Sequence, residues 1–213
     1  MEALILYFVL FFPGIYGMPF PDSQLQSIPF STLRELSRTL TYTIPSLALL
    51  WYLISDKNGF SALKDIKPGR SDLLPLAIGL PGLIIIGLLV SLMVSLFSGP
   101  SPPPLIEAPL TIPGTFVMIF ACLGTGYLEE TYFRYYLLTR LRRLLPQPAK
   151  RIMLSVILFS MCHIYEGPWG VLNAAIAGIL LSVLFIHRRS LHGIAWAHSA
   201  YNIFVYSMGI FGS

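Results

Sequence analysis

Three charged residues, Glu129, Glu130 and Arg134, lie inside one long apolar stretch near the middle of the chain. A charge at the centre of a bilayer costs roughly 2.5–3.5 kcal/mol on insertion scales, and residues that bear this cost usually have a function. Because Glu130 and Arg134 are four residues apart, they share a helix face and can form an ion pair. Glu129 is rotated by about 100° and cannot meet the same partner equally well. The spacing predicts a paired, structural Glu130 beside a chemically available Glu129.

Two histidines, His163 and His198, lie in other apolar stretches, and each has a notable residue four positions away. Phe159 precedes His163 and Asn202 follows His198, so each pair shares a helix face. A rise of about 1.5 Å per residue puts Glu129 about 16 Å, His163 about 18 Å and His198 about 14 Å from the basic ends of their helices. The hydrocarbon core is about 30 Å thick. We therefore expect a carboxylate and two imidazoles at one level near the middle of the membrane.

These groups suit two related mechanisms of hydrolysis, most naturally of an amide bond. In the first, a carboxylate and one histidine deprotonate a water molecule, and the second histidine and an amide group donate hydrogen bonds to the developing oxyanion. In the second, Glu129, His163 and His198 hold a zinc ion with a water molecule in the open position. The first is favoured because His198 and Asn202 on one face form a two-donor hole, and because no second carboxylate is evident to orient a zinc-bound His198. Zinc therefore stays a possible cofactor rather than an expected one.

The elements that position these residues are membrane helices. The chain has 213 residues, of which 55% are hydrophobic and 11% charged, with a mean hydropathy of +0.71; soluble domains are about 25% charged. The net charge of +4 is explained by basic loops that set membrane topology, so no nucleic-acid partner is expected. The partners implied are the lipid bilayer and a membrane-associated peptide or protein.

We predict an all-α, polytopic membrane helical bundle with about seven transmembrane helices. The first segment is short and interrupted by Pro13-Gly14, so whether residues 3–16 fully span is left open. The expected spans are Ala3–Tyr16, Thr39–Ile54, Leu73–Ser98, Gly114–Leu138, Ile152–Tyr165, Trp169–Ile186 and Leu191–Ile210.

Loop charges predict the orientation of these spans. The loops at 56–72, 140–151 and 187–189 are basic, and basic loops are usually cytoplasmic. Arg34 and Arg38 are exceptions, because the same alternation puts them on the outer side. We expect an integral multi-pass protein of the plasma (inner) membrane of a prokaryote.

Three motifs occur in a fixed order, each inside an expected span. The set resembles the CPBP family, the intramembrane CAAX-processing (type II CAAX prenyl endopeptidase-like) and bacteriocin-related, Abi-like proteases, over roughly residues 110–210. The resemblance implies a catalytic helical core at 110–213, preceded at 1–109 by transmembrane helices and connectors without motifs. The motifs are Glu129-Glu130-x-x-x-Arg134, Phe159-x-x-x-His163 and His198-x-x-x-Asn202.

The resemblance also implies a role for each motif residue. Glu129 would be the catalytic glutamate of an endopeptidase, and His163 its partner in activating water. His198 and Asn202 would stabilise the oxyanion. Supporting roles would fall to Glu130, Arg134 and Phe159. Members of the family have been regarded both as glutamate proteases and as metalloendopeptidases, and the family name suggests CAAX-like substrates.

Two other functions fit part of this pattern. One is a non-enzymatic membrane protein of the same fold, an immunity or scaffolding factor that has kept the motifs. The other is a proton-coupled transporter that uses Glu129 and the histidines as a relay. Such a transporter predicts inverted repeats with broken helices in corresponding halves, and the sequence shows neither.

Overall fold

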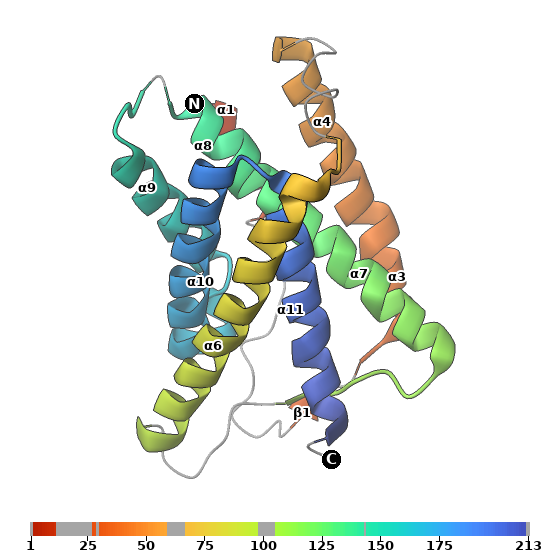
Figure 1. The fold of residues 1–213 in the computed structure, drawn as a ribbon. Helices are drawn as coiled ribbons and strands as arrows, with labels where there is room; N and C mark the ends of the chain where they lie inside the picture. Colours follow the sequence, from red (N-terminus) through yellow and green to blue (C-terminus); the bar gives the residue numbers. More distant parts are fainter. Residues whose placement is uncertain are drawn as a thin grey trace.

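The computed structural model describes residues 2–11, 27–28, 30–58, 67–97, 105–142 and 144–211. Tilted helices make up nearly all of the described structure (Figure 1). The exception is a short parallel pair of strands, β1 (Ser27–Ile28) and β2 (Leu105–Ile106). The predicted all-α membrane fold class is thus confirmed.

Several helical elements run on from one another without a break. The segments α3, η1 and α4 form one long helix, and so do α7, η3 and α8, where η1 and η3 are π-helical. The elements in chain order are α1 (Glu2–Leu10), α3 (Thr32–Arg38), η1 (Thr39–Thr43), α4 (Ile44–Asn58), η2 (Arg70–Asp72), α6 (Leu73–Phe97), α7 (Ile112–Glu130), η3 (Thr131–Leu137), α8 (Leu138–Arg140), α9 (Pro148–Met161), η4 (Ile164–Glu166), α10 (Gly167–Arg188) and α11 (Leu191–Phe211).

Local sequence signals explain where these helices begin and end. The Thr111 hydroxyl accepts a hydrogen bond from the Gly114 N–H at 3.2 Å and caps α7, which satisfies one of the unpaired N–H groups of a first turn. A proline at the first helical turn begins α9, a position that proline favours. Arg189, with a φ of 53°, ends α10 in the left-handed conformation that commonly closes a helix.

Three helical segments among the described residues are long and apolar enough to cross a membrane: Arg70–Phe97, Ile112–Arg140 and Ile164–Arg188. The expected count of about seven is not confirmed. The segment α9, with 14 residues, is shorter than the roughly 20 that a bilayer needs. Part of the expected first segment, Ala3–Tyr16, lies outside the described residues.

Small residues set the close helix crossings around the site. A Cβ on Gly126 of α7 would come within 2.3 Å of the Ser199 Oγ on α11. A Cβ on Gly178 of α10 would lie 3.2 Å from the ring of Phe159 on α9. Such close approach between membrane helices usually requires glycine or another small residue. These crossings pack α11 against the part of α7 that carries both glutamates and pack α10 against α9, and both α9 and α10 also contact η3, which follows Glu130.

The helix ends that flank the basic loops lie at one end of the molecule. In Figure 1, α4 ends, α6 begins, α8 ends and the α10–α11 connection runs in the upper half of the view. These element ends adjoin the three basic loops. The long helix formed by α3, η1 and α4 has its C-terminal end in this half of the molecule. Arg34 and Arg38 are in α3 and therefore lie toward the opposite end of the molecule.

Candidate active site

Glu130 and Arg134 form a fully buried ion pair. The Arg134 Nη1 lies 3.1 Å from the Glu130 Oε1, and neither side chain is exposed (0% for both). The four-residue spacing predicts this contact. A lone buried charge is strongly destabilising, so each member depends on the other.

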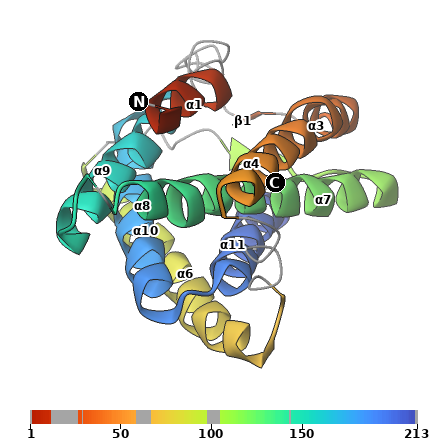
Figure 2. The ribbon, with the colours of Figure 1, turned by 90° about the horizontal axis from the view of Figure 1, so that it is seen from above.

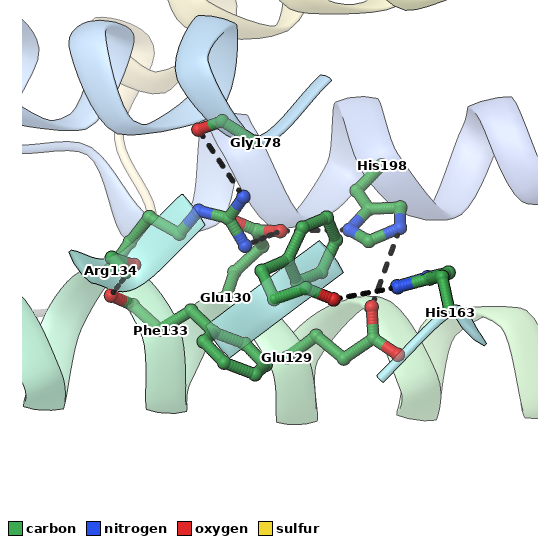
Figure 3. Close-up of polar contacts among 9 residues, drawn as sticks. Glu129, Glu130, Phe133, Arg134, His163, Gly178 and His198 are labelled. Carbon is green, nitrogen blue, oxygen red and sulfur yellow. Dashed lines mark hydrogen bonds and ion pairs between the residues drawn. The ribbon is translucent and has the colours of Figure 1, made fainter. Parts of the chain in front are cut away.

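Arg134 is held on further sides by neutral groups. Its Nη2 donates to the backbone carbonyl of Gly178 at 3.5 Å, and its guanidinium lies 4.2 Å from the centre of the Phe159 ring (Figure 3). Sequence reasoning missed the role of the Gly178 carbonyl. The available signal was the small-residue spacing Gly170, Ala174 and Gly178, which indicates a close helix contact.

The backbone that carries Arg134 is π-helical rather than α-helical. The segment η3 begins directly after Glu130 and ends at Leu137. Single π-helical turns are rare and often occur at functional sites. Within this segment the carbonyl of Phe133 accepts a hydrogen bond from the Ser155 hydroxyl at 3.0 Å, which ties η3 to α9. Hydrophobic periodicity gives no sign of this local widening.

Glu129 has a different environment from its neighbour. Its side chain keeps 16% of its surface exposed, and its Oε2 lies 3.6 Å from the Nε2 of His198. That separation is too long for a hydrogen bond. Within the described part of the chain, the buried Oε2 has no hydrogen-bond partner. The Glu130 Oε2 also lacks a partner there, but the Glu130 side chain is 0% exposed, so Glu129 is the one of the two carboxylates that keeps exposed surface.

His198 lies between the two glutamates. Its Nδ1–H donates to the Glu130 Oε1 at 2.8 Å, and its Nε2 faces Glu129 (Figure 3). The expectation that no second carboxylate orients His198 was wrong, because Glu130 does so. The close crossing of α7 and α11 at Gly126 explains how the ring reaches both glutamates. A carboxylate on one ring nitrogen fixes the orientation of the ring and leaves the other nitrogen for the reaction.

His163 lies beyond the end of α9, not inside a span as predicted. The helix ends at Met161, and a short 3-10 turn, η4, follows His163. The His163 Nδ1 is 2.8 Å from the carbonyl oxygen of Phe159. Carbonyls in the last turn of a helix lack partners, and the imidazole N–H supplies one, which explains how the ring is held where α9 stops.

Phe159 connects the three motifs. Its ring centre lies 4.7 Å from that of His163 and 6.1 Å from that of His198, while Arg134 covers its face. Asn202 is half-buried, one turn beyond His198 on α11. Its side chain makes no hydrogen bond with the described residues, whereas the other six site residues are joined by the contacts above.

A zinc site requires donor groups that meet at one point. Glu129 and His198 face one another, and Glu130 orients His198 as a metal-bound histidine is often oriented. Zinc in a catalytic site takes three protein ligands. Within the described ranges, no group of three or more His, Cys, Asp or Glu side chains is placed to hold a metal ion. The arrangement of Glu129, His163 and His198 therefore does not fit a three-ligand zinc site.

Arg38 is a charged neighbour that sequence reasoning did not assign to the site. It forms an ion pair with Glu35 at 3.0 Å and a hydrogen bond with the Thr125 Oγ1 at 3.4 Å. Glu129 also lies within electrostatic range of Arg38. The signal was its charge, because Arg38 departs from the basic-loop pattern that the rest of the chain follows.

Comparison with known proteins supports the same region. Residues 111–204 match the family model described as "Type II CAAX prenyl endopeptidase Rce1-like". No curated protein and no solved structure matches the chain. The family is one of proteases, which supports an intramembrane protease and confirms the resemblance predicted from the three motifs. The region from 111 to 204, which carries all seven site residues, is thus similar to the Rce1-like family of type II CAAX prenyl endopeptidases.

Proposed function

We propose that the protein is an intramembrane endopeptidase that hydrolyses peptide bonds of membrane-associated or CAAX-like substrates. The observation that carries this proposal is the pair formed by Glu129 and His198. The carboxylate oxygen of Glu129 is buried without a hydrogen bond, and it faces an imidazole nitrogen 3.6 Å away. A general base requires a free acceptor within reach of water and substrate.

Glu129 takes a proton from a water molecule, and the water oxygen forms a bond with the substrate carbonyl carbon. His163 helps to hold this water. Its Nδ1–H donates to the Phe159 carbonyl, so its Nε2 presents a lone pair. The proton then passes from Glu129 to the amide nitrogen as the C–N bond breaks, which leaves a carboxylic acid and an amine.

In its imidazolium form, His198 keeps Nδ1–H on Glu130 and donates Nε2–H to the carbonyl oxygen of the substrate, so that it stabilises the negative charge together with Asn202. The attacking water and the developing oxyanion are bonded to the same carbon, so base and donor must lie within a few ångströms of each other. The short distance between Glu129 and His198 suits this demand. Asn202, one helical turn away, can supply a second donor from its amide.

Glu130, Arg134 and Phe159 act as positioning residues in this proposal. Glu130 orients the His198 ring, Arg134 neutralises Glu130, and Phe159 packs against Arg134 and both histidines. A preorganised site requires such fixed neighbours. We further propose the plasma (inner) membrane of a prokaryote as its location, with the basic loops in the cytoplasm.

The proposal can be tested by proteomics of membrane peptides. Cells carrying the wild type are compared with cells carrying Glu129→Gln, which keeps the size of the side chain and removes the base. Glu107→Gln is the matched control, because Glu107 is an exposed carboxylate outside the site. We expect a set of cleaved peptides that is lost with Glu129→Gln and kept with the control. Identical peptide sets in all three strains, with the variant present in the membrane, would contradict an endopeptidase.

A further inference from the structure

A second polar feature lies outside the candidate active site. A cavity of about 330 Å³ lies between the start of α6, the segment α8 and the α10–α11 connection. It is at the basic end of the molecule, the end from which Figure 2 is seen. None of the seven site residues lines it. Its apolar floor is formed by Tyr135, Phe185 and Leu191.

Three cationic side chains line this cavity without ion-pair partners. Lys67, Arg188 and Arg189 are exposed, and none of them forms an ion pair within the described part of the chain. The hydroxyls of Ser71 and Thr139 also line the cavity. Like charges around one cavity repel each other unless an anion lies between them.

Asp72, the one carboxylate among the residues that line the cavity, already accepts hydrogen bonds on both oxygens. Asp72 is 5% exposed, and its Oδ1 accepts a hydrogen bond from the Ser190 hydroxyl. Its Oδ2 accepts the Gly69 N–H at 2.7 Å. Asp72 therefore fixes the start of α6 to the start of α11. Three cations against one carboxylate leave the cavity net positive.

The position of the cavity indicates which anion it meets. The membrane-crossing segments Arg70–Phe97, Ile112–Arg140 and Ile164–Arg188 each have one end at this end of the molecule. The cavity therefore lies at the boundary between hydrocarbon and water, where phospholipid headgroups are found. Leu73 and Leu74, directly after the cavity residues of η2, are 56% and 45% exposed and offer an apolar surface for an acyl chain.

We propose that this cavity binds a phosphate group, supplied by the headgroup of an anionic phospholipid. Arginine is well suited to phosphate because its planar guanidinium donates two hydrogen bonds in parallel. Basic pockets between membrane helices are a known type of anionic-lipid site. The volume exceeds that of a single small ion, so it accommodates a headgroup. This inference is independent of the proposed peptidase activity.

The test uses the full chain in detergent. Native mass spectrometry measures how much phosphatidylglycerol or phosphatidylcholine stays bound, and a parallel titration uses inorganic phosphate. The variants are Arg188→Gln and Lys67→Gln, and the matched control is Arg142→Gln. Arg142 is exposed on a basic loop at the same end but does not line the cavity. Thermal melting of each variant shows whether it is folded.

We expect each cavity variant to bind phosphatidylglycerol about fivefold more weakly, the effect of one basic side chain near an anionic lipid. The control and phosphatidylcholine binding should not change. Variant-dependent binding of inorganic phosphate, without an effect on phosphatidylglycerol, would keep the phosphate site and identify free phosphate as the ligand. The proposal is overturned if folded Arg188→Gln and Lys67→Gln bind both probes as the wild type does, or if Arg142→Gln weakens binding equally.

Discussion

Glu129 and Glu130 are adjacent in sequence, yet their surroundings differ almost completely. Glu130 is inaccessible and contacts both Arg134 and His198. The Glu129 side chain keeps 16% of its surface exposed, although each of the two carboxylates has one oxygen without a hydrogen bond among the described residues. The difference shows how one helix can hold a structural and a chemical carboxylate side by side. A rotation of about 100° between neighbours lets Glu130 pair with Arg134 and with His198 of α11, while the Glu129 side chain stays partly exposed.

His198 joins the two environments. It donates to Glu130 through one nitrogen and faces Glu129 through the other. The buried ion pair therefore supports the orientation of a ring that the proposed mechanism uses. A substitution at Glu130 or Arg134 should disturb the His198 ring and so alter the surroundings of Glu129. A substitution at Glu129 should leave the buried ion pair intact.

The sharpest test of this contrast is the pair of variants Glu129→Gln and Glu130→Gln. We expect Glu129→Gln to lower hydrolysis by at least about 10²–10⁴-fold, the contribution of a positioned general base, with an unchanged melting temperature. A peptide-cleavage assay in proteoliposomes and thermal melting measure the two effects, with Glu107→Gln as control. If instead Glu130→Gln abolishes cleavage at unchanged melting temperature, the two roles are reversed.

Removing the charge of Arg134 should destabilise the fold, because Arg134 is the cation that pairs with Glu130. Arg134→Leu leaves Glu130 buried without its cation, and we expect the free energy of unfolding to fall by about 3–5 kcal/mol. Unfolding by denaturant in detergent measures the change. Arg142→Leu is the control, because Arg142 is exposed. Equal stability of Arg134→Leu and the wild type would show that the ion pair is not needed for the fold.

The oxyanion assignment predicts an effect on rate without an effect on stability. Asn202→Ala should lower kcat by about 10²–10³-fold, as loss of one oxyanion donor does, while KM changes little. Asn173→Ala is the comparison, since Asn173 is an amide of the membrane-crossing segment Ile164–Arg188 and lies outside the site. Equal kcat values for Asn202→Ala and the wild type would remove Asn202 from the mechanism.

Phe159→Leu should affect the surroundings of both glutamates, but less strongly than the three substitutions above. The ring contacts Arg134 and both histidines, and aromatic and cation–π contacts each contribute about 0.5–2 kcal/mol. We expect a loss of about 1–2 kcal/mol in the free energy of unfolding and a reduced kcat. Phe120→Leu, at an exposed position, should change neither. A Phe159→Leu protein with wild-type stability and rate would show that the ring is replaceable.

Chelation should have the smallest effect. The described donors do not form a three-ligand set, so we expect hydrolysis to be unchanged after dialysis against a chelator. Metal analysis of the purified protein accompanies the assay. Stoichiometric zinc, with hydrolysis lost on its removal and restored on its return, would instead favour a metalloendopeptidase.

Much of the fold and site follows from the sequence. Long apolar segments predict membrane helices, because the core of a soluble domain cannot bury so many of them. The Leu73–Ser98 span agrees closely with α6, which covers Leu73–Phe97. The Glu130–Arg134 contact follows from four-residue spacing, since helix geometry is local. The three motifs were enough to predict the family that residues 111–204 match.

Other features were decided by tertiary structure, because they depend on how helices meet. Periodicity could not show that His163 lies past the end of α9, where its ring pairs with the Phe159 carbonyl. Nor could it show the π-helical turn after Glu130. The placement of His198 between the two glutamates required the close crossing of α7 and α11 at Gly126. The sequence by itself determined which residues carry charge in the membrane, and packing between helices decided which of them face one another.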